Sequence, residues 1–214
     1  MAWSGWPALQ EASATLAQAS PHMAQGLAQI VPNASLPQQL PAAALLFIAA
    51  IRSGDFESWI GPKAMDLLRK ADKTDLIGRL TRDAASITRS SAEPVAQDWR
   101  PMPLPFYSDG QMQGMMLWYR RDDSHKDEND STAERKTRFV FDLRLTRMGQ
   151  IQLDGLAKGQ RIDLILRTTK TISPAMRHDM RQKYLSALEN AQFTGELSFQ
   201  DKAEQFVKIG SARP

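Results

Sequence analysis

Three aspartates in the second half of the chain are the side chains whose type and spacing are best suited to chemistry. They are Asp142, Asp154 and Asp163. Each falls on the polar side of a stretch in which apolar and polar residues alternate, the pattern of a half-buried strand. Carboxylates that converge from neighbouring strands could act as a general acid and a general base, or could hold a metal ion. A basic residue lies near each of them, in order Arg144, Lys158 and Arg161. We therefore favour a charged sheet face with cross-strand ion pairs over a catalytic site.

Other side chains that could support catalysis form no consistent pattern. The three histidines, His22, His125 and His178, are not spaced as metal ligands, either from one another or from paired carboxylates. The chain has no cysteine, which excludes disulfides, thiolate catalysis and cysteine-bound metals. Glycine-rich phosphate loops and serine-nucleophile motifs do not occur in the sequence. We expect a protein that is not an enzyme and that uses no cofactor, metal or small-molecule substrate.

Arginines provide the candidate binding surface, because several could line up on one face of a sheet and bind phosphate groups. They are Arg138, Arg144, Arg147, Arg161 and Arg167. Phe139 and Phe141, however, fall on the opposite, apolar side of their strand and do not interleave with these arginines as in sheet-based RNA-binding proteins. A net charge of only +3 is also weak support for nucleic acid. We expect a protein partner and keep nucleic-acid binding by the basic face of the sheet as the alternative. The expected contact residues are Arg144, Arg147, Arg161 and Arg167.

The elements that carry these residues are predicted from the apolar periodicity. Strands are expected at about 99–107, 112–121, 137–145, 150–156 and 161–168, and a last strand at about 193–200. Ser173-Pro174 is typical of a helix start, and the helix that follows has the apolar stripe Met176, Met180, Tyr184, Leu185 and Leu188. The order β-β-β-β-β-α-β predicts a mostly antiparallel sheet with one helix packed on a face. No element is assigned to the tail that contains Phe206, Val207 and Ile209.

The first half of the chain has a different composition and is expected to be helical. Residues 1–97 are rich in Ala, Leu and Gln, with prolines where helices would begin. The apolar run at 42–51 is too short to span a membrane, which takes about 20 residues. We predict an α+β protein with a helical domain at 1–97 and an α+β domain at 98–214. A mobile polar loop is expected at about 122–136, because that stretch contains no large apolar residue.

Residues from about 139 to 199 resemble the C-terminal domain of flagellar hook-length control proteins. The matching segments are the strand LRL at 143–145, the turn at Gly149, and the strands QIQL at 150–153 and RIDLILR at 161–167. The helical segment MRQKYLSAL at 180–188 and the strand GELSF at 195–199 complete the pattern. Where the family has a Pro-x-x-Leu-Gly turn, this chain has the shorter Thr146-Arg147-Met148-Gly149.

The resemblance implies a role and no catalytic residue, since the family's domain is a binding module. It implies a bacterial protein that docks on the cytoplasmic domain of the flagellar type III export gate and switches the class of exported substrate. The expected location is the cytoplasm, with export through the flagellar apparatus as the alternative. Residues 1–97 do not resemble the long, low-complexity portion of that family, and we expect them to fold.

Overall fold

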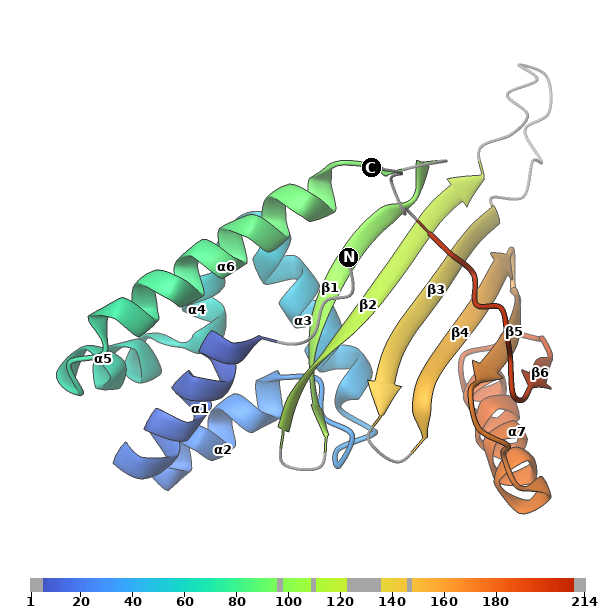
Figure 1. The fold of residues 1–214 in the computed structure, drawn as a ribbon, viewed down its shortest axis with the longest axis horizontal. Coiled ribbons are helices and arrows are strands. Elements are labelled where there is room, and N and C mark those ends of the chain that lie inside the picture. Colours follow the sequence, from blue (N-terminus) through green and yellow to red (C-terminus); the bar gives the residue numbers. More distant parts are fainter. Residues whose placement is uncertain (1–5, 96–97, 109–110, 123–135, 146–147, 210–214) are drawn as a thin grey trace. The chain divides into compact units, whose positions relative to one another are not determined.

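A computed structural model describes residues 6–95, 98–108, 111–122, 136–145 and 148–209. Within these residues, helices α1 to α6 are followed by strands β1 to β5, helix α7 and strand β6 (Figure 1). The hydrogen-bonded strand order is β1-β2-β3-β4-β5-β6. The predicted α+β class and the order β-β-β-β-β-α-β are confirmed. Almost all of the predicted loop at 122–136 lies outside the described residues.

The chain forms two compact units, which are described separately below. One comprises residues 1–93 and 102–115, and the other comprises residues 94–101 and 116–214. The sequence placed a single boundary near residue 97. The division differs from that expectation because residues 102–115 pack with the helices.

Prolines and a glycine set the ends of several helices in the first unit. Proline lies at the first or second position of α1, α2, α3 and α5, where its missing N–H is not needed and its fixed φ suits a helix. Gly54 ends α3 in the left-handed region at φ 73°. The helices are α1 (Pro7–Ala19), α2 (Pro21–Ile30), α3 (Leu40–Ser53), α4 (Phe56–Ile60), α5 (Pro62–Lys70) and α6 (Thr74–Ala92).

The apolar stripes of these helices meet in one core. Its fully buried members include Leu9, Leu16, Phe47, Ile51, Met65, Leu68, Leu76 and Leu80. Trp6 stacks on Phe56 with ring centroids 5.2 Å apart, and its Nε1 donates a hydrogen bond of 2.9 Å to Asp83. The N-terminal tryptophan is therefore part of the core of this unit, with its polar edge satisfied.

Strand β1 (Arg100–Ser108) ends the sheet at one side and contributes Met102 and Leu104 to the core of the helical unit. Its alternating prolines have no N–H to donate, so the strand suits the edge of a sheet. The segment after α2 lies beside it, where the Tyr107 N–H donates to the carbonyl of Pro32 over 2.8 Å. These contacts explain why residues 102–108 cluster with the helices.

In the second unit, three strands form an antiparallel meander and a fourth is added in parallel. The first turn of the meander joins β3 (Lys136–Leu145) to β4 (Gly149–Lys158), and the second joins β4 to β5 (Arg161–Thr168). After α7 (Pro174–Asn190), β6 (Leu197–Gln200) pairs in parallel with β5. Strand β2 (Gln111–Asp122) precedes the meander and is shared between the two units.

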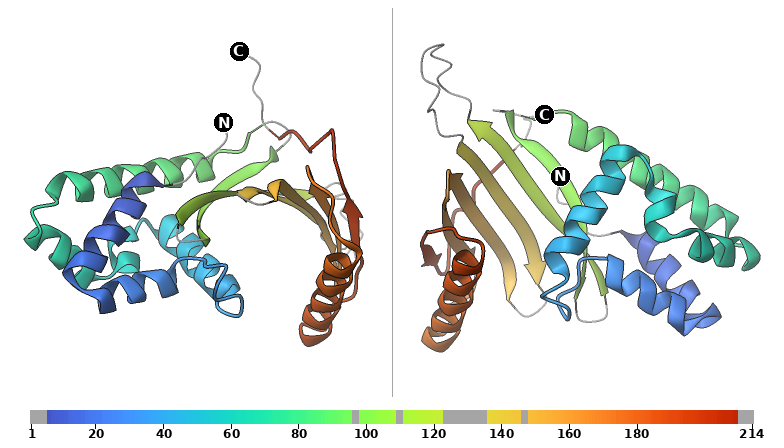
Figure 2. Two further views of the ribbon diagram at one scale, coloured as in Figure 1. Left: turned by 60° about the horizontal axis from the view of Figure 1, so that its bottom comes forward. Right: turned by 180° about the vertical axis from the view of Figure 1, so that it is seen from behind.

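The apolar face of this sheet carries the core of the second unit, on the side where α7 lies (Figure 2). Cross-strand partners Phe141 and Leu153, and then Leu153 and Leu166, match apolar residues on that face as the alternation predicted. The buried cluster is Ile151, Leu166, Ile172 and Leu197, with Met180 and Tyr184 of α7 packed against it.

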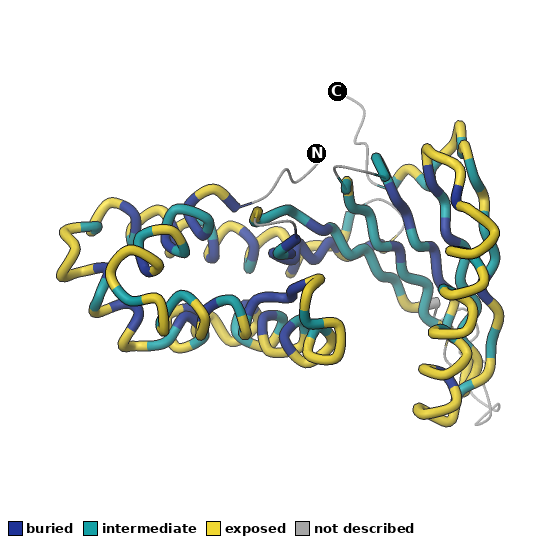
Figure 3. The backbone as a smooth tube through the Cα atoms, turned by 90° about the horizontal axis from the view of Figure 1, so that it is seen from below, coloured by how far each residue is buried: buried dark blue, intermediate teal, exposed yellow. Residues whose placement is uncertain are grey.

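The predicted apolar stripe of α7 is only partly a core stripe. Leu188 is buried and Met180 and Tyr184 are half-buried, but Met176 and Leu185 are 43% and 49% exposed. Much of this helix is accordingly drawn as exposed in Figure 3. The expectation fails for Leu185 because it follows Tyr184, and consecutive helical residues point about 100° apart.

Candidate functional site

The second face of the sheet brings together the polar residues that the sequence singled out. The register places Asp142 opposite Gln152, Gln152 opposite Arg167, and Arg167 beside Gln200. Residues directly opposite each other on neighbouring strands share a face. One polar face therefore runs across β3, β4, β5 and β6.

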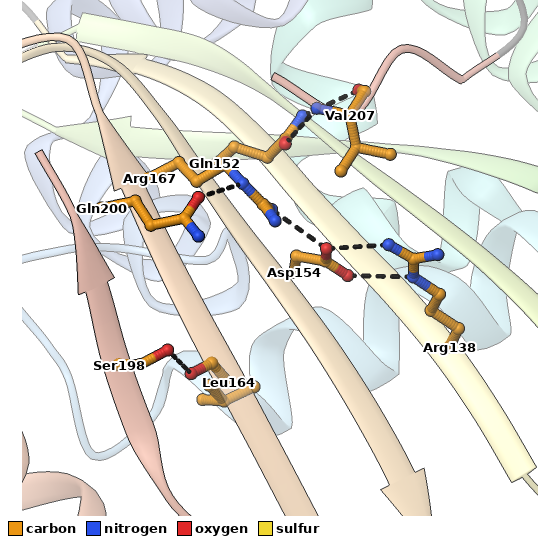
Figure 4. Close-up of polar contacts among 8 residues, drawn as sticks. All are labelled: Arg138, Gln152, Asp154, Leu164, Arg167, Ser198, Gln200 and Val207. Carbon is orange, nitrogen blue, oxygen red and sulfur yellow. Dashed lines mark hydrogen bonds and ion pairs between the residues drawn. The ribbon is translucent and has the colours of Figure 1, made fainter. Parts of the chain in front are cut away.

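Asp154 is the centre of this face and is 6% exposed. Arg138 holds it with two hydrogen bonds, from Nε to Oδ1 over 3.1 Å and from Nη2 to Oδ2 over 2.9 Å (Figure 4). Arg167 donates from Nη1 to Oδ2 over 3.0 Å and from Nε to the Oε1 of Gln200 over 2.9 Å. The result is a hydrogen-bonded chain from β3 through β4 and β5 to β6.

This arrangement keeps Asp154 ionised. Burial raises the pKa of its carboxyl group, but the hydrogen bonds and positive charges of Arg138 and Arg167 outweigh that effect and hold the pKa below its usual range. The bond to Asp154 also raises the pKa of Arg138, against the opposing effect of burial. Both carboxylate oxygens are occupied by guanidinium groups, so Asp154 is suited to a structural role and poorly suited to accept a proton from a substrate.

Arg138 also contacts an aromatic ring that the sequence did not connect with the site. Its guanidinium lies 5.9 Å from the ring centroid of Trp99, and that of Arg120 lies 5.1 Å from the same ring. Trp99 is 4% exposed. Because an arginine attracted to an aromatic ring loses freedom, these contacts help to fix the orientation of Arg138 toward Asp154.

Asp142 and Asp163 have their own, separate partners. Gln150 Nε2 donates to Asp142 Oδ1 over 3.3 Å. Arg161 Nε donates to Asp163 Oδ2 over 2.7 Å, and the N–H of Glu196 donates to Asp163 Oδ1 over 3.0 Å. Asp163 thereby links β5 to the segment that enters β6, while its ion pair with Arg161 is solvent-exposed and contributes little by itself.

The charged contacts on this face lie both within strands, as for Asp163 and Asp142, and between strands, as for Asp154. Arg161 is the partner of Asp163 as expected, and Arg144 acts on Asp142 through its charge. Lys158 was the expected partner of Asp154, but Lys158 lies at the end of β4, opposite Lys136. Arg138 and Arg167 take that place, because each comes from a neighbouring strand two residues along from the position facing Asp154.

The arginines predicted to contact a partner are not equivalent. Arg144 and Arg161 are exposed, whereas the side chain of Arg167 is only 12% exposed and is engaged by Asp154 and Gln200. Arg147 lies outside the described residues. Arg167 is therefore best described as part of the Asp154 network.

Burial has a measurable consequence at Asp142. Desolvation raises the pKa of its carboxyl group, against weaker lowering by Gln150, Arg144 and Gln152. The ionised form thus costs stability at neutral pH. We expect Asp142→Asn to raise the free energy of unfolding by less than about 1 kcal/mol at about pH 7, because the side chain is half-exposed and water screens the effect.

Urea unfolding at several pH values would measure this difference. Because the folded-state pKa is raised, the folded wild-type chain takes up the proton before the unfolded chain as the pH falls. The advantage of Asp142→Asn should therefore shrink toward about pH 4. An advantage that grew with acidity would contradict the expectation.

Gln152, which the alternation places on the polar side of its strand, is 1% exposed. Its Nε2 donates to the carbonyl of Val207 over 3.0 Å, and its Oε1 accepts from the N–H of the same residue over 2.8 Å (Figure 4). These two hydrogen bonds attach the tail after β6 to the polar face, opposite to the face that carries α7. In the sequence, the only hint is a glutamine in the middle of a charged face, and this does not indicate a partner.

Other candidate sites give little support for chemistry. His22 and His178 are exposed, and His125 lies outside the described residues. In the described part of the chain, no group of three or more His, Cys, Asp or Glu residues could hold a metal ion. A hollow of about 230 Å³ in the helical unit is lined by small, apolar and amide side chains together with Tyr107.

Comparison of the chain with protein-family models, with curated proteins and with solved structures gives no match. Across the described residues, none of the helices combines the length and apolar character that crossing a membrane requires.

Proposed function

We propose that the chain is a non-enzymatic protein-interaction module that docks on the cytoplasmic domain of the flagellar type III export gate and switches the class of exported substrate. What supports the proposal is the unit formed by β3, β4, β5, α7 and β6. Its antiparallel meander, crossing helix and parallel last strand correspond in order to the segments that resemble the hook-length control domain. The function is carried by the resemblance, and the fold is compatible with it.

The polar face favours binding over catalysis. Asp142, Asp154 and Asp163 have separate hydrogen-bond partners, and the most deeply buried of them is held ionised between two guanidinium groups. A general acid and base need carboxyl groups that can exchange protons with a substrate. These carboxylates instead tie neighbouring strands together, as expected of a rigid binding scaffold.

The nucleic-acid alternative has less support. Arg138 and Arg167 would need free guanidinium groups to contact phosphates, but both donate to Asp154. Phe139 and Phe141 contact each other edge to face on the apolar side of the sheet, 5.9 Å between ring centroids, away from these arginines. Base stacking and phosphate contacts would therefore fall on opposite faces.

The test is the affinity of the purified full chain for the cytoplasmic domain of the export gate. We expect Arg144→Glu combined with Arg161→Glu to weaken binding about tenfold, or about 1.4 kcal/mol, because both arginines are exposed and face solvent with their charge. Lys63→Glu combined with Lys70→Glu reverses two charges at exposed positions of the helical unit. This matched control should leave the affinity unchanged.

Titration calorimetry would report the affinities, and a motility assay of a deletion strain would test the biological role. Absence of binding together with normal motility would refute the export role. Salt-dependent shifts of single- or double-stranded nucleic acid would favour the alternative instead, with a slope that reports the number of phosphates neutralised.

A further inference from the structure

The hydrogen bonds between Gln152 and Val207 have the form of β-sheet pairing. In a sheet, a residue exchanges one N–H and one carbonyl with its neighbour. Here the side-chain amide of Gln152 supplies both groups to a single backbone residue, over 3.0 and 2.8 Å. Such an amide recognises the extended backbone itself, and so it would accept any segment of suitable shape.

The segment that occupies this position is weakly held. Ala203 donates its N–H to the carbonyl of Thr168 over 2.9 Å, and Val207 bonds to Gln152. Every residue from 203 to 209 is exposed or half-exposed. Segments with few buried contacts open at low free-energy cost while the rest of the protein stays folded.

The sheet residues beneath the segment are much more deeply buried than the segment itself. Val140 is 0% exposed, Gln152 1% and Asp154 6%. Removing the segment would leave the buried Oε1 of Gln152 without the Val207 N–H and would take the Val207 carbonyl from its Nε2. That loss is costly unless another chain or water replaces the segment. The site therefore favours continued occupation by a backbone.

The surrounding charge indicates which backbone would fit. Arg144 is exposed on β3 and can attract an acidic side chain, whereas Arg138 is engaged by Asp154. The chain's own segment carries one acidic residue, Glu204, and one basic residue, Lys208, and its Val207 bonds to Gln152. An extended peptide with an apolar residue over Gln152 and acidic residues beside it matches this combination.

We propose that the polar face around Gln152 is a docking site for an extended, apolar and acidic segment of a protein partner, and that residues 203–209 occupy this site within the chain until the partner replaces them. This inference deepens the proposed function and rests on it in one respect, that the α+β unit is a protein-interaction module. Binding would then exchange one extended segment for another.

The tethered segment has a large advantage over a free peptide. A short flexible connection gives it an effective concentration of about 1 mM or more, so a free peptide at micromolar concentration would hardly compete. The tail must therefore be released before the site can be measured. Val207→Pro does so in the full chain, because proline has no N–H for Oε1 of Gln152.

The probe is a capped synthetic peptide with the sequence of residues 203–209, labelled for fluorescence anisotropy. We expect the Val207→Pro chain to bind it at least about tenfold more tightly than the wild-type chain. Lys208→Pro places the same residue one position later, keeps the Val207 N–H and serves as the matched control. Adding Gln152→Ala to Val207→Pro should abolish binding. Equal affinity of the wild-type and Val207→Pro chains, or binding that survives Gln152→Ala, would overturn the proposal.

Hydrogen exchange of the wild-type chain gives a second test that needs no variant. The Val207 amide should exchange at least about a hundredfold faster than the amides of Leu153 and Leu166 in the sheet, since only local release is required. Exchange of all three at one common rate would show that the segment leaves only on unfolding, and would overturn the proposal.

The outcomes separate this site from the wider function. A chain that binds the export gate but not the peptide retains the proposed function and loses the docking site. A chain that binds the peptide but not the gate retains the docking site and loses the gate as partner. A concentration-dependent dimer of the Val207→Pro chain, absent with Gln152→Ala, would assign the site to the tail of a second copy and overturn the proposed partner.

Discussion

Gly195→Ala should be the most destabilising single-methyl change in the sheet unit. Gly195 has a φ of 154°, and a Cβ atom there would lie 1.6 Å from the carbonyl oxygen of Ile162. Because that oxygen belongs to the backbone, it cannot move away as the end of a flexible side chain could. We expect the free energy of unfolding to fall by about 3 to 4 kcal/mol, through backbone strain and separation of the two segments.

The position of Gly195 explains why the effect should spread. On either side of it, Ile162 donates its N–H to Thr194 and Leu164 donates to Glu196, each over 2.8 Å. The Ile162 carbonyl also accepts a hydrogen bond from the hydroxyl of Tyr184 in α7. Displacing the chain at Gly195 would therefore weaken both the entry of β6 and the attachment of the helix.

Urea unfolding with hydrogen exchange would measure the loss and locate it. Amides of β5 should lose protection while amides of α6, in the other unit, keep it. Gly26→Ala is the matched control, because nothing lies within 4 Å of a Cβ built at Gly26 in α2. That substitution should stabilise the chain by about 0.5 to 1 kcal/mol. Equal effects of the two substitutions would contradict this account of Gly195.

Local patterns were sufficient to predict most elements of the sheet unit. Alternation at Phe141, Leu143, Ile151 and Leu153 assigns one side of the hairpin to the core, and the register pairs Phe141 with Leu153 and Leu143 with Ile151. Ser173 was expected to cap the long helix, and its hydroxyl accepts the N–H of Met176 over 3.2 Å. These features depend on residues close together in the sequence, so the sequence alone carries the necessary information.

Contacts between distant residues could not be predicted in the same way. Gln152 and Val207 are 55 residues apart, and nothing in either neighbourhood indicates the other. The pairing of Asp154 with Arg138 and Arg167 depends on which strands are neighbours and on their exact offset. A shift of one residue would move each side chain to the opposite face. Three-dimensional placement decides such partners, and sequence spacing suggested Lys158 instead.

Asp154→Ala should cost about 3 kcal/mol of unfolding free energy at neutral pH. The substitution leaves the guanidinium of Arg167, whose side chain is 12% exposed, without its buried counter-charge. Removing one member of a buried ion pair lowers stability by much more than the intact pair contributes, because the remaining charge stays poorly solvated. Arg138 is 36% exposed and can regain water, which keeps the expected loss at the lower end of the range.

Lowering the pH should reduce the difference in unfolding free energy between wild type and Asp154→Ala. The hydrogen bonds to Arg138 and Arg167 lower the folded-state pKa of Asp154 below that of the unfolded chain, despite burial. As the pH falls, the unfolded chain therefore takes up the proton first, and the stabilisation by Asp154 is lost below about pH 4. The gap between wild type and Asp154→Ala should be full at about pH 7 and should narrow progressively below about pH 4.

Asp179→Ala supplies the control in the same unit, since Asp179 and Lys183 form an exposed pair with side chains 62% and 77% exposed. It should change stability by less than about 0.5 kcal/mol, because water screens such pairs. Two results would mean that the Asp154 network does not hold the strands together. One is a loss of unfolding free energy in Asp154→Ala no greater than that in Asp179→Ala. The other is a difference between wild type and Asp154→Ala that increases at low pH. The docking site beside Gln152 would then lack the rigid support that fixes its amide, so this measurement also bears on the mode of binding.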